Sequence, residues 1–177
     1  HVRIGATQLK LGQPEQALKS FQRALVLDPG HRDALRWMAM LHTSQGRLDE
    51  AVTAYERLVE ESPEDHFVLS TLADLYVMQN ELPRAIELYE QLAKTQGPSY
   101  QLHFNLGVLQ GRMGHLDESI FQLSRAIEQS PNAIEARVAL GLTYELAKQP
   151  LMAEAHYQEA IKIDPLNPRL YYHAAAS

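Results

Sequence analysis

The chain has 177 residues, of which 45% are hydrophobic and 21% charged, and this balance is ordinary for a globular protein. Its net charge is −6 and its basic residues form no cluster, which argues against sequence-independent nucleic-acid binding. No apolar run approaches the ~20 residues that a transmembrane helix requires, and the absence of cysteine excludes disulfides, thiol catalysis and thiolate metal sites.

The sequence repeats itself every 34 residues, and no insertion breaks the register. A small residue recurs at one position of the period, a bulky residue at a second, and a turn residue closes each unit. A fixed period of this size predicts a solenoid, in which each unit buries its apolar face on its neighbours. The small residues are Gly5, Ala39, Ala73, Gly107, Gly141 and Ala175, the bulky ones are Phe21, Tyr55, Tyr89, Leu123 and Tyr157, and the closing ones are Pro29, Pro63, Gly97, Pro131 and Pro165.

In chain order, the repeats cover residues 1–31, 32–65, 66–99, 100–133 and 134–167, and a partial sixth repeat covers residues 168–177. Each repeat predicts two helices, because apolar residues recur at helical spacing on both sides of a break. In the second repeat, one face of the first helix carries Leu35, Met38, Ala39 and His42, and one face of the second carries Leu48, Ala51, Val52, Tyr55 and Leu58.

The residue between the two helices of each repeat favours a left-handed backbone that ends the first helix. Gly12, Gly46 and Gly114 adopt this conformation without a side-chain penalty, and Asn80 is the next best residue for it. Lys148 is less well suited. The second helices then begin with Pro14, Pro83 or Pro150 in their first turn, where a missing N–H costs little.

The repeats are incomplete at both ends of the sequence. The first begins inside a helix at His1, and the sixth ends at Ser177 after one helix. We therefore expect the chain to be a fragment of a longer protein.

The recurring residues resemble the tetratricopeptide repeat (TPR) signature of Trp-x2-Leu-Gly-x2-Tyr, then Ala-x3-Phe, then Pro. The fourth repeat departs most from it, with Gln110, Ser119 and Leu123 at three signature positions. The resemblance covers the whole chain and implies an all-α, right-handed superhelical solenoid of antiparallel helix pairs with about 11 helices. It also implies a protein-binding scaffold, without naming the partner. The fifth repeat is the most similar, with Leu140, Gly141, Tyr144, Ala153, Tyr157 and Pro165.

Signals of catalysis are absent from the sequence. It contains no Gly-rich phosphate loop, no His-Glu-x2-His motif and no Gly-x-Ser-x-Gly motif. The eight histidines are scattered, and His42 and His103 lie at positions that usually pack between helices. We therefore expect no enzymatic activity, no cofactor and no metal site.

The resemblance implies that the first helices of the repeats line a concave groove and that the second helices form the convex face. Helix geometry places a second set of residues opposite the packing face of each first helix. This set is unusually apolar for a solvent-exposed surface, a feature that is typical of interaction sites. The alternative is that some members pack between successive first helices. The expected groove residues, called the stripe below, are Arg36, Met40, Phe67, Asp74, Val77, Gln101, Phe104, Asn105, Val108, Arg112, Glu135, Leu142 and Glu145.

One known TPR ligand is excluded by the stripe. Family members that bind acidic chaperone tails resemble one another in a clamp of Lys, Asn and Arg residues. Asn105 matches the middle Asn of that clamp, but Asp74 and Glu135 occupy basic or amide positions and would repel a carboxylate. We therefore expect no chaperone-tail binding.

The main hypothesis is a non-catalytic scaffold that binds a peptide or amphipathic helix of another protein in the groove. One alternative is a self-assembly module that forms homo-oligomers through its ends, with the tail 171–176 inserted into a neighbouring copy. Another is a recruitment domain appended to an enzyme or an export machine. We expect no nucleic-acid partner and no membrane insertion. The compartment is unknown, with the cytoplasm favoured over the periplasm.

Overall fold

The structure is a computed structural model that describes residues 1–176 and the side chains of residues 1–174, so the side chains of the last alanines lie outside it. Over the described residues the chain forms eleven helices and no strand, as predicted. No helix in this range is long and apolar enough to cross a membrane. The helices are α1 (Val2–Lys10), α2 (Pro14–Leu27), α3 (Arg32–Ser44), α4 (Leu48–Glu61), α5 (His66–Met78), α6 (Leu82–Gln96), α7 (Tyr100–Arg112), α8 (Leu116–Gln129), α9 (Ile134–Leu146), α10 (Pro150–Ile163) and α11 (Pro168–Ala176).

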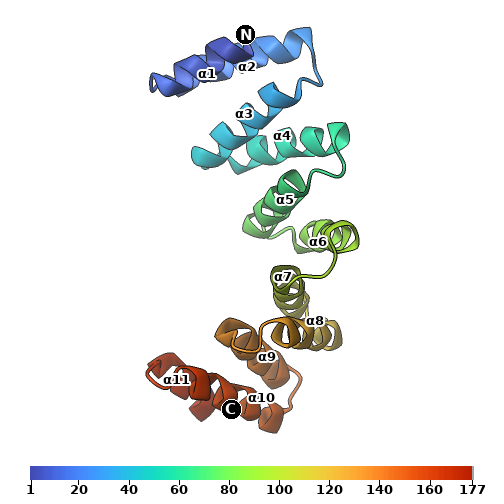
Figure 1. Cartoon of the computed structure of the whole chain (residues 1–177), viewed down its shortest axis with the longest axis vertical. Helices are drawn as coiled ribbons and strands as arrows, with labels where there is room; N and C mark the ends of the chain where they lie inside the picture. The colour runs from blue at the N-terminus through green and yellow to red at the C-terminus, as the bar shows by residue number, and fades with distance from the viewer. Residues whose placement is uncertain (177) are drawn as a thin grey trace. The chain divides into compact units, whose positions relative to one another are not determined.

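The chain divides into two compact units, residues 1–88 and 89–177, whose boundary lies inside α6. Unit 1 contains α1 to α5 and the first part of α6 (Figure 1). Within it, α1 packs on α2, α3 packs on α4, and α1 also contacts α3. Unit 2 contains α7 to α11, where α7 packs on α8, α9 packs on α10, and α7 contacts α9. First helices of successive repeats therefore lie side by side, as α1 and α3 do in unit 1 and α7 and α9 do in unit 2.

The breaks between paired helices have the predicted left-handed backbone. The φ angles are 70°, 69° and 81° at Gly12, Gly46 and Gly114, and 61° at Asn80. At the end of α3, the N–H of Arg47 donates to the carbonyl of His42 at 3.0 Å, and that of Gly46 to the carbonyl of Thr43 at 3.1 Å. This is the Schellman arrangement, which satisfies carbonyls at a helix C-terminus.

Lys148 takes the same left-handed conformation, with φ at 57°. Its N–H donates to the carbonyl of Glu145, and that of Gln149 to the carbonyl of Tyr144, both at 2.9 Å. These bonds impose the conformation on a residue that is poorly suited to it, so the repeat geometry overrides the local preference.

The small and bulky positions of the period are explained by direct contact between them. A Cβ atom built on Gly5 would lie 2.5 Å from the Phe21 ring, and one built on Gly141 would lie 2.4 Å from the Tyr157 ring. In these two repeats the bulky side chain of the second helix therefore rests on the bare backbone of the first helix. Phe21, Tyr55, Leu123 and Tyr157 are fully or almost fully buried.

The unusual Ser119 of the fourth repeat is fully buried and fully bonded. Its hydroxyl donates to the carbonyl of Gly107 at 2.7 Å and lies 3.1 Å from the hydroxyl oxygen of Thr143. A buried hydroxyl without partners would be costly, and the two oxygens on α7 and α9 remove that cost.

His42 packs between helices, as predicted, and burial lowers the pKa of its imidazole while nearby Glu50 raises it. Its Nδ1 has no hydrogen-bond partner among the described residues. Because the folded-state pKa lies below the unfolded value of 6.5, protonation favours the unfolded chain. The contribution of this group to stability is complete above that value and is lost as the pH falls from there through the lower, folded-state pKa.

We expect the variant His42→Gln to lose less stability than the wild type between pH 7.5 and pH 5.5. Glutamine is accommodated at the equivalent position two repeats later, where Gln110 is buried. Urea unfolding followed by circular dichroism at several pH values measures the difference. His115→Gln, at an exposed site, is the control. Identical pH profiles for the wild type and His42→Gln would contradict the prediction.

Candidate functional site

The stripe residues lie on the first helices of both units. Those of unit 1 are on α3 and α5, and those of unit 2 are on α7 and α9.

In unit 1, three large apolar side chains of α3 and α5 are exposed to solvent. Met40 is 45% exposed, Phe67 59% and Met78 65%. Asp74 is also exposed, and Val77 is half-buried. This part of the surface therefore combines accessible hydrophobic side chains with a negative charge.

Arg36 belongs to the stripe but forms a bond within the unit. Its guanidinium lies 2.6 Å from Oδ2 of Asp65, and Oδ1 of Asp65 accepts a hydrogen bond from the N–H of Val68 at the start of α5. The sequence analysis placed Arg36 among the residues expected to face the groove. In the structure it also ties α3 to the N-terminus of α5.

Trp37 is a partly exposed residue beside the stripe that the sequence reasoning missed. Its indole is 37% exposed and stacks on the buried Phe21 ring, with centroids 6.3 Å apart and planes 3° from parallel. Residues three apart share a helix face, so Trp37 and Met40 lie together on α3. A detectable signal was present, because Trp37 is the only tryptophan of the chain and directly follows Arg36.

In unit 2, the exposed apolar residue of the stripe is Leu142 of α9, which is 40% exposed. Leu146, four residues further along the same helix, lies beside the stripe and is more exposed still. Gln101, Arg112 and Glu135 are exposed and carry the polar contribution, while Val108 is half-buried. The amide of Gln101 donates to Oδ1 of Asn105 at 2.8 Å, which orients both side chains.

Glu145 accepts a hydrogen bond from the Tyr157 hydroxyl at 2.8 Å. Burial, and then this bond, raise the pKa of Tyr157, so its hydroxyl remains a donor. The half-buried Glu145 therefore supports the packing of α9 on α10, a role that its stripe position did not predict.

Phe104 of the stripe has packing partners in the structure. Its ring is half-buried, stacks on Tyr100 with centroids 5.8 Å apart, and packs against a buried cluster of Ala126, Ala133 and Ala136. The small alanines of α8 and α9 leave room that this ring fills. Phe104 therefore packs toward the next first helix, which was the alternative for stripe residues, and also toward the second helix α8.

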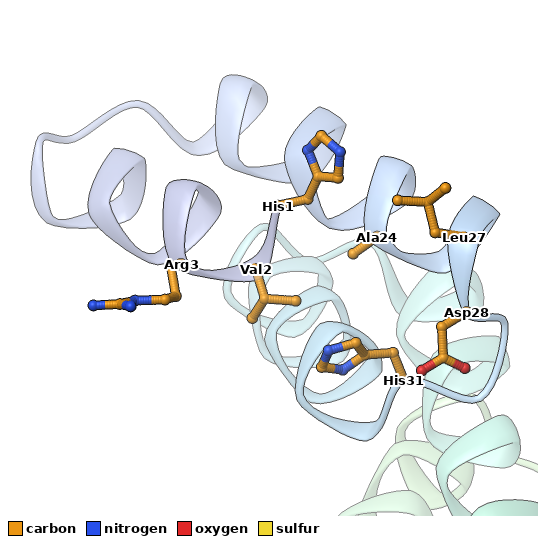
Figure 2. A pocket seen from close by; sticks show the side chains of 7 residues that line it. All are labelled: His1, Val2, Arg3, Ala24, Leu27, Asp28 and His31. Atoms are coloured by element: carbon orange, nitrogen blue, oxygen red, sulfur yellow. The ribbon is translucent and has the colours of Figure 1, made fainter.

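A separate cavity of about 330 Å³ lies where α1 begins and the loop between α2 and α3 passes (Figure 2). Ala24 and Leu27 of α2 form its apolar wall, and His1, Asp28 and His31 add polar groups. Figure 2 shows the Arg3 side chain pointing away from the other lining residues. Among the described residues, no group of three or more His, Asp or Glu side chains is arranged to hold a metal ion.

Comparison with known proteins identifies the repeats. Two family models described as tetratricopeptide repeat match the chain, one over residues 3–66 and 108–168 and the other over residues 43–103. No curated protein sequence matches it.

Solved structures are similar over nearly the whole chain. YrrB, described as a TPR protein with an unusual peptide-binding site, has a TM-score of 0.84 at 21% identity, over 99% of this chain and 90% of its own. MamA from Desulfovibrio magneticus RS-1 has a TM-score of 0.76 at 16% identity, over 92% of both chains. A thermophilic TPR protein of Thermus thermophilus, TTC0263, has a TM-score of 0.62 at 24% identity, over 99% of this chain and 95% of its own.

These low identities establish the fold alone, and the family assignment rests on the family models, one of which matches more than half of the residues. TPR proteins are generally non-catalytic scaffolds for protein–protein interaction. The chain belongs to the tetratricopeptide repeat family.

Proposed function

We propose that the chain is a non-catalytic scaffold that binds a peptide or an amphipathic helix of another protein along the stripe. The observation that carries the proposal is the exposure of Trp37, Met40 and Phe67 on the first helices of unit 1. Tryptophan is enriched among residues that dominate binding energy, and methionine adapts to varied apolar partners. The bond between Arg36 and Asp65 supports a common surface, because it joins α3 to the start of α5.

The stripe residues of unit 2 support the same function. Leu142 and the adjacent Leu146 offer apolar contacts there, and Gln101, Arg112 and Glu135 offer polar ones. Apolar anchors surrounded by polar groups are the usual composition of a peptide-binding surface. The structural similarity to YrrB, a TPR protein with a peptide-binding site, is consistent with a ligand of this class.

The test begins with a pull-down by the intact protein and identification of the retained peptide. We expect Met40→Glu and Leu142→Glu to raise the Kd for that peptide about tenfold or more, because each buries a charge in an apolar contact. Isothermal titration calorimetry measures the change. Phe104→Ala is unsuitable, because its packing against the alanine cluster makes a loss of stability the expected result.

Leu151→Glu provides the matched control for this experiment. Leu151 is more exposed than Leu142 or Leu146 but lies on α10, a second helix. The proposal requires that this variant binds as the wild type does. Unchanged affinity in both stripe variants would contradict it.

Self-assembly through the C-terminal end is a second candidate function. Leu166, Tyr171 and Tyr172 are exposed on α11 and the loop before it, so this end presents an apolar surface. Static light scattering at high concentration tests the candidate. A strictly monomeric protein would contradict it and would leave the scaffold proposal intact.

A further inference from the structure

A second cavity lies in unit 1 on the face of α5 opposite the stripe. It has a volume of about 460 Å³, and three helices line it. Leu72 and Tyr76 of α5 are almost fully buried beneath it. They lie one turn apart on the helix, while Asp74 of the stripe lies between them in sequence and points to the other face. The remaining lining residues are Glu56, Val59 and Glu60 of α4 and Arg84, Glu87 and Leu88 of α6.

This cavity already holds one positive charge supplied by the chain itself. The Arg84 guanidinium lies over the Tyr76 ring, 4.1 Å from its centroid, and 2.5 Å from the carboxylate of Glu56. The Tyr76 hydroxyl donates to the same carboxylate at 2.6 Å, and this bond holds the pKa of Glu56 below its usual range. The Tyr76 ring and the Glu56 carboxylate thus together bind one cation, the guanidinium of Arg84.

Two further carboxylates that line the cavity, one on α4 and one on α6, form no ion pair with the described residues. They belong to Glu60 and Glu87, which are both exposed. Since Arg84 balances only Glu56, the lining of the cavity carries an excess of negative charge above an apolar floor.

The fold does not require this pair of glutamates. Glu60 lies on one second helix and Glu87 on the following second helix. One repeat earlier, the equivalent residues are Val26 and Thr53. One repeat later they are Lys94 and Phe121, and two repeats later they are Glu128 and Ala155. All four pairs occupy the same kind of repeat, so packing does not account for two facing carboxylates in one of them. Both carboxylates are exposed and are therefore accessible to a ligand of the cavity.

We propose that the cavity between α4, α5 and α6 binds a lysine side chain presented by a partner protein. The alkyl stem of the lysine packs on Val59, Leu72 and Leu88, and its ammonium group lies between the carboxylates of Glu60 and Glu87. Long basic side chains bind in this way where apolar surface and negative charge adjoin. The cavity lies outside the stripe, so this binding does not depend on the function proposed above.

The test uses the whole chain, isotope-labelled for NMR, and a short peptide with blocked ends, Ala-Leu-Lys-Leu-Ala. We expect saturable shifts of the amide signals of Leu72, Tyr76 and Leu88 on titration. The same peptide with norleucine in place of lysine isolates the role of the ammonium group, because norleucine keeps most of the alkyl stem. Equal binding of the two peptides would overturn the proposal, as would shifts confined to Met40 and Phe67 of the stripe.

The double variant Glu60→Gln/Glu87→Gln should weaken the lysine peptide about fivefold to tenfold, the scale expected for two partly desolvated ion pairs. Glu118→Gln/Glu154→Gln changes the net charge by the same amount on the exposed surface of unit 2 and is the matched control. Retained affinity in the control supports a specific site. An equal loss in both double variants would mean non-specific attraction to an acidic protein and would overturn the proposal.

Discussion

Tyr157→Ala is expected to lower the free energy of unfolding by about 3–5 kcal/mol, the range for deleting a large aromatic side chain from a core. The ring of Tyr157 is fully buried, rests on the backbone of Gly141 and stacks on His173 with centroids 5.4 Å apart. Its loss would leave a cavity at the point where α9, α10 and α11 meet. Urea unfolding followed by circular dichroism measures the effect.

Tyr157→Phe is the matched control for this prediction. It keeps the ring and removes only the hydroxyl that donates to Glu145. Since Glu145 is half-buried and retains access to water, we expect a loss of about 0.5–1.5 kcal/mol. If the alanine variant were no less stable than the phenylalanine variant, the ring would not be the main contact of the fifth repeat.

Gly141→Val is expected to destabilise the protein by about 3 kcal/mol, at the upper end of the usual cost of overpacking. Even the first added carbon would lie 2.4 Å from Tyr157 Cε1, well inside van der Waals contact. The ring has no free space to enter, because it is fully buried. Replacing a glycine inside a helix normally stabilises the helix by up to ~1 kcal/mol, and the cost of overpacking here exceeds that gain.

Gly141→Ala provides the graded comparison. The second repeat pairs Ala39 with a buried Tyr55, so a repeat of this kind accommodates one added carbon. We therefore expect the alanine variant to lie between the wild type and Gly141→Val in thermal and urea unfolding. A valine variant as stable as the wild type would show that the two helices separate freely, contrary to the contact described here.

The period in the sequence determined the helices and the residues that join them. Each small residue and its bulky partner lie in adjacent helices of one repeat, as Gly5 and Phe21 do. The left-handed residues, Asn80 among them, end the first helices by hydrogen bonds within a few residues. These features are local in sequence and recur in every repeat, and a fixed register is enough to reveal them.

The state of each stripe residue was decided only by the tertiary structure. Phe104 and Met40 were both predicted to face the groove, but the Phe104 ring packs against the cluster of Ala126, Ala133 and Ala136 and is half-buried, while Met40 stays exposed. Glu145 is bound by Tyr157 of the next helix, and Arg36 is bound by Asp65 at the start of the next first helix. The partner of each side chain lies on another helix and differs from repeat to repeat. Helical periodicity specifies the direction in which a residue points, but the side chains that meet it there depend on how the helices pack.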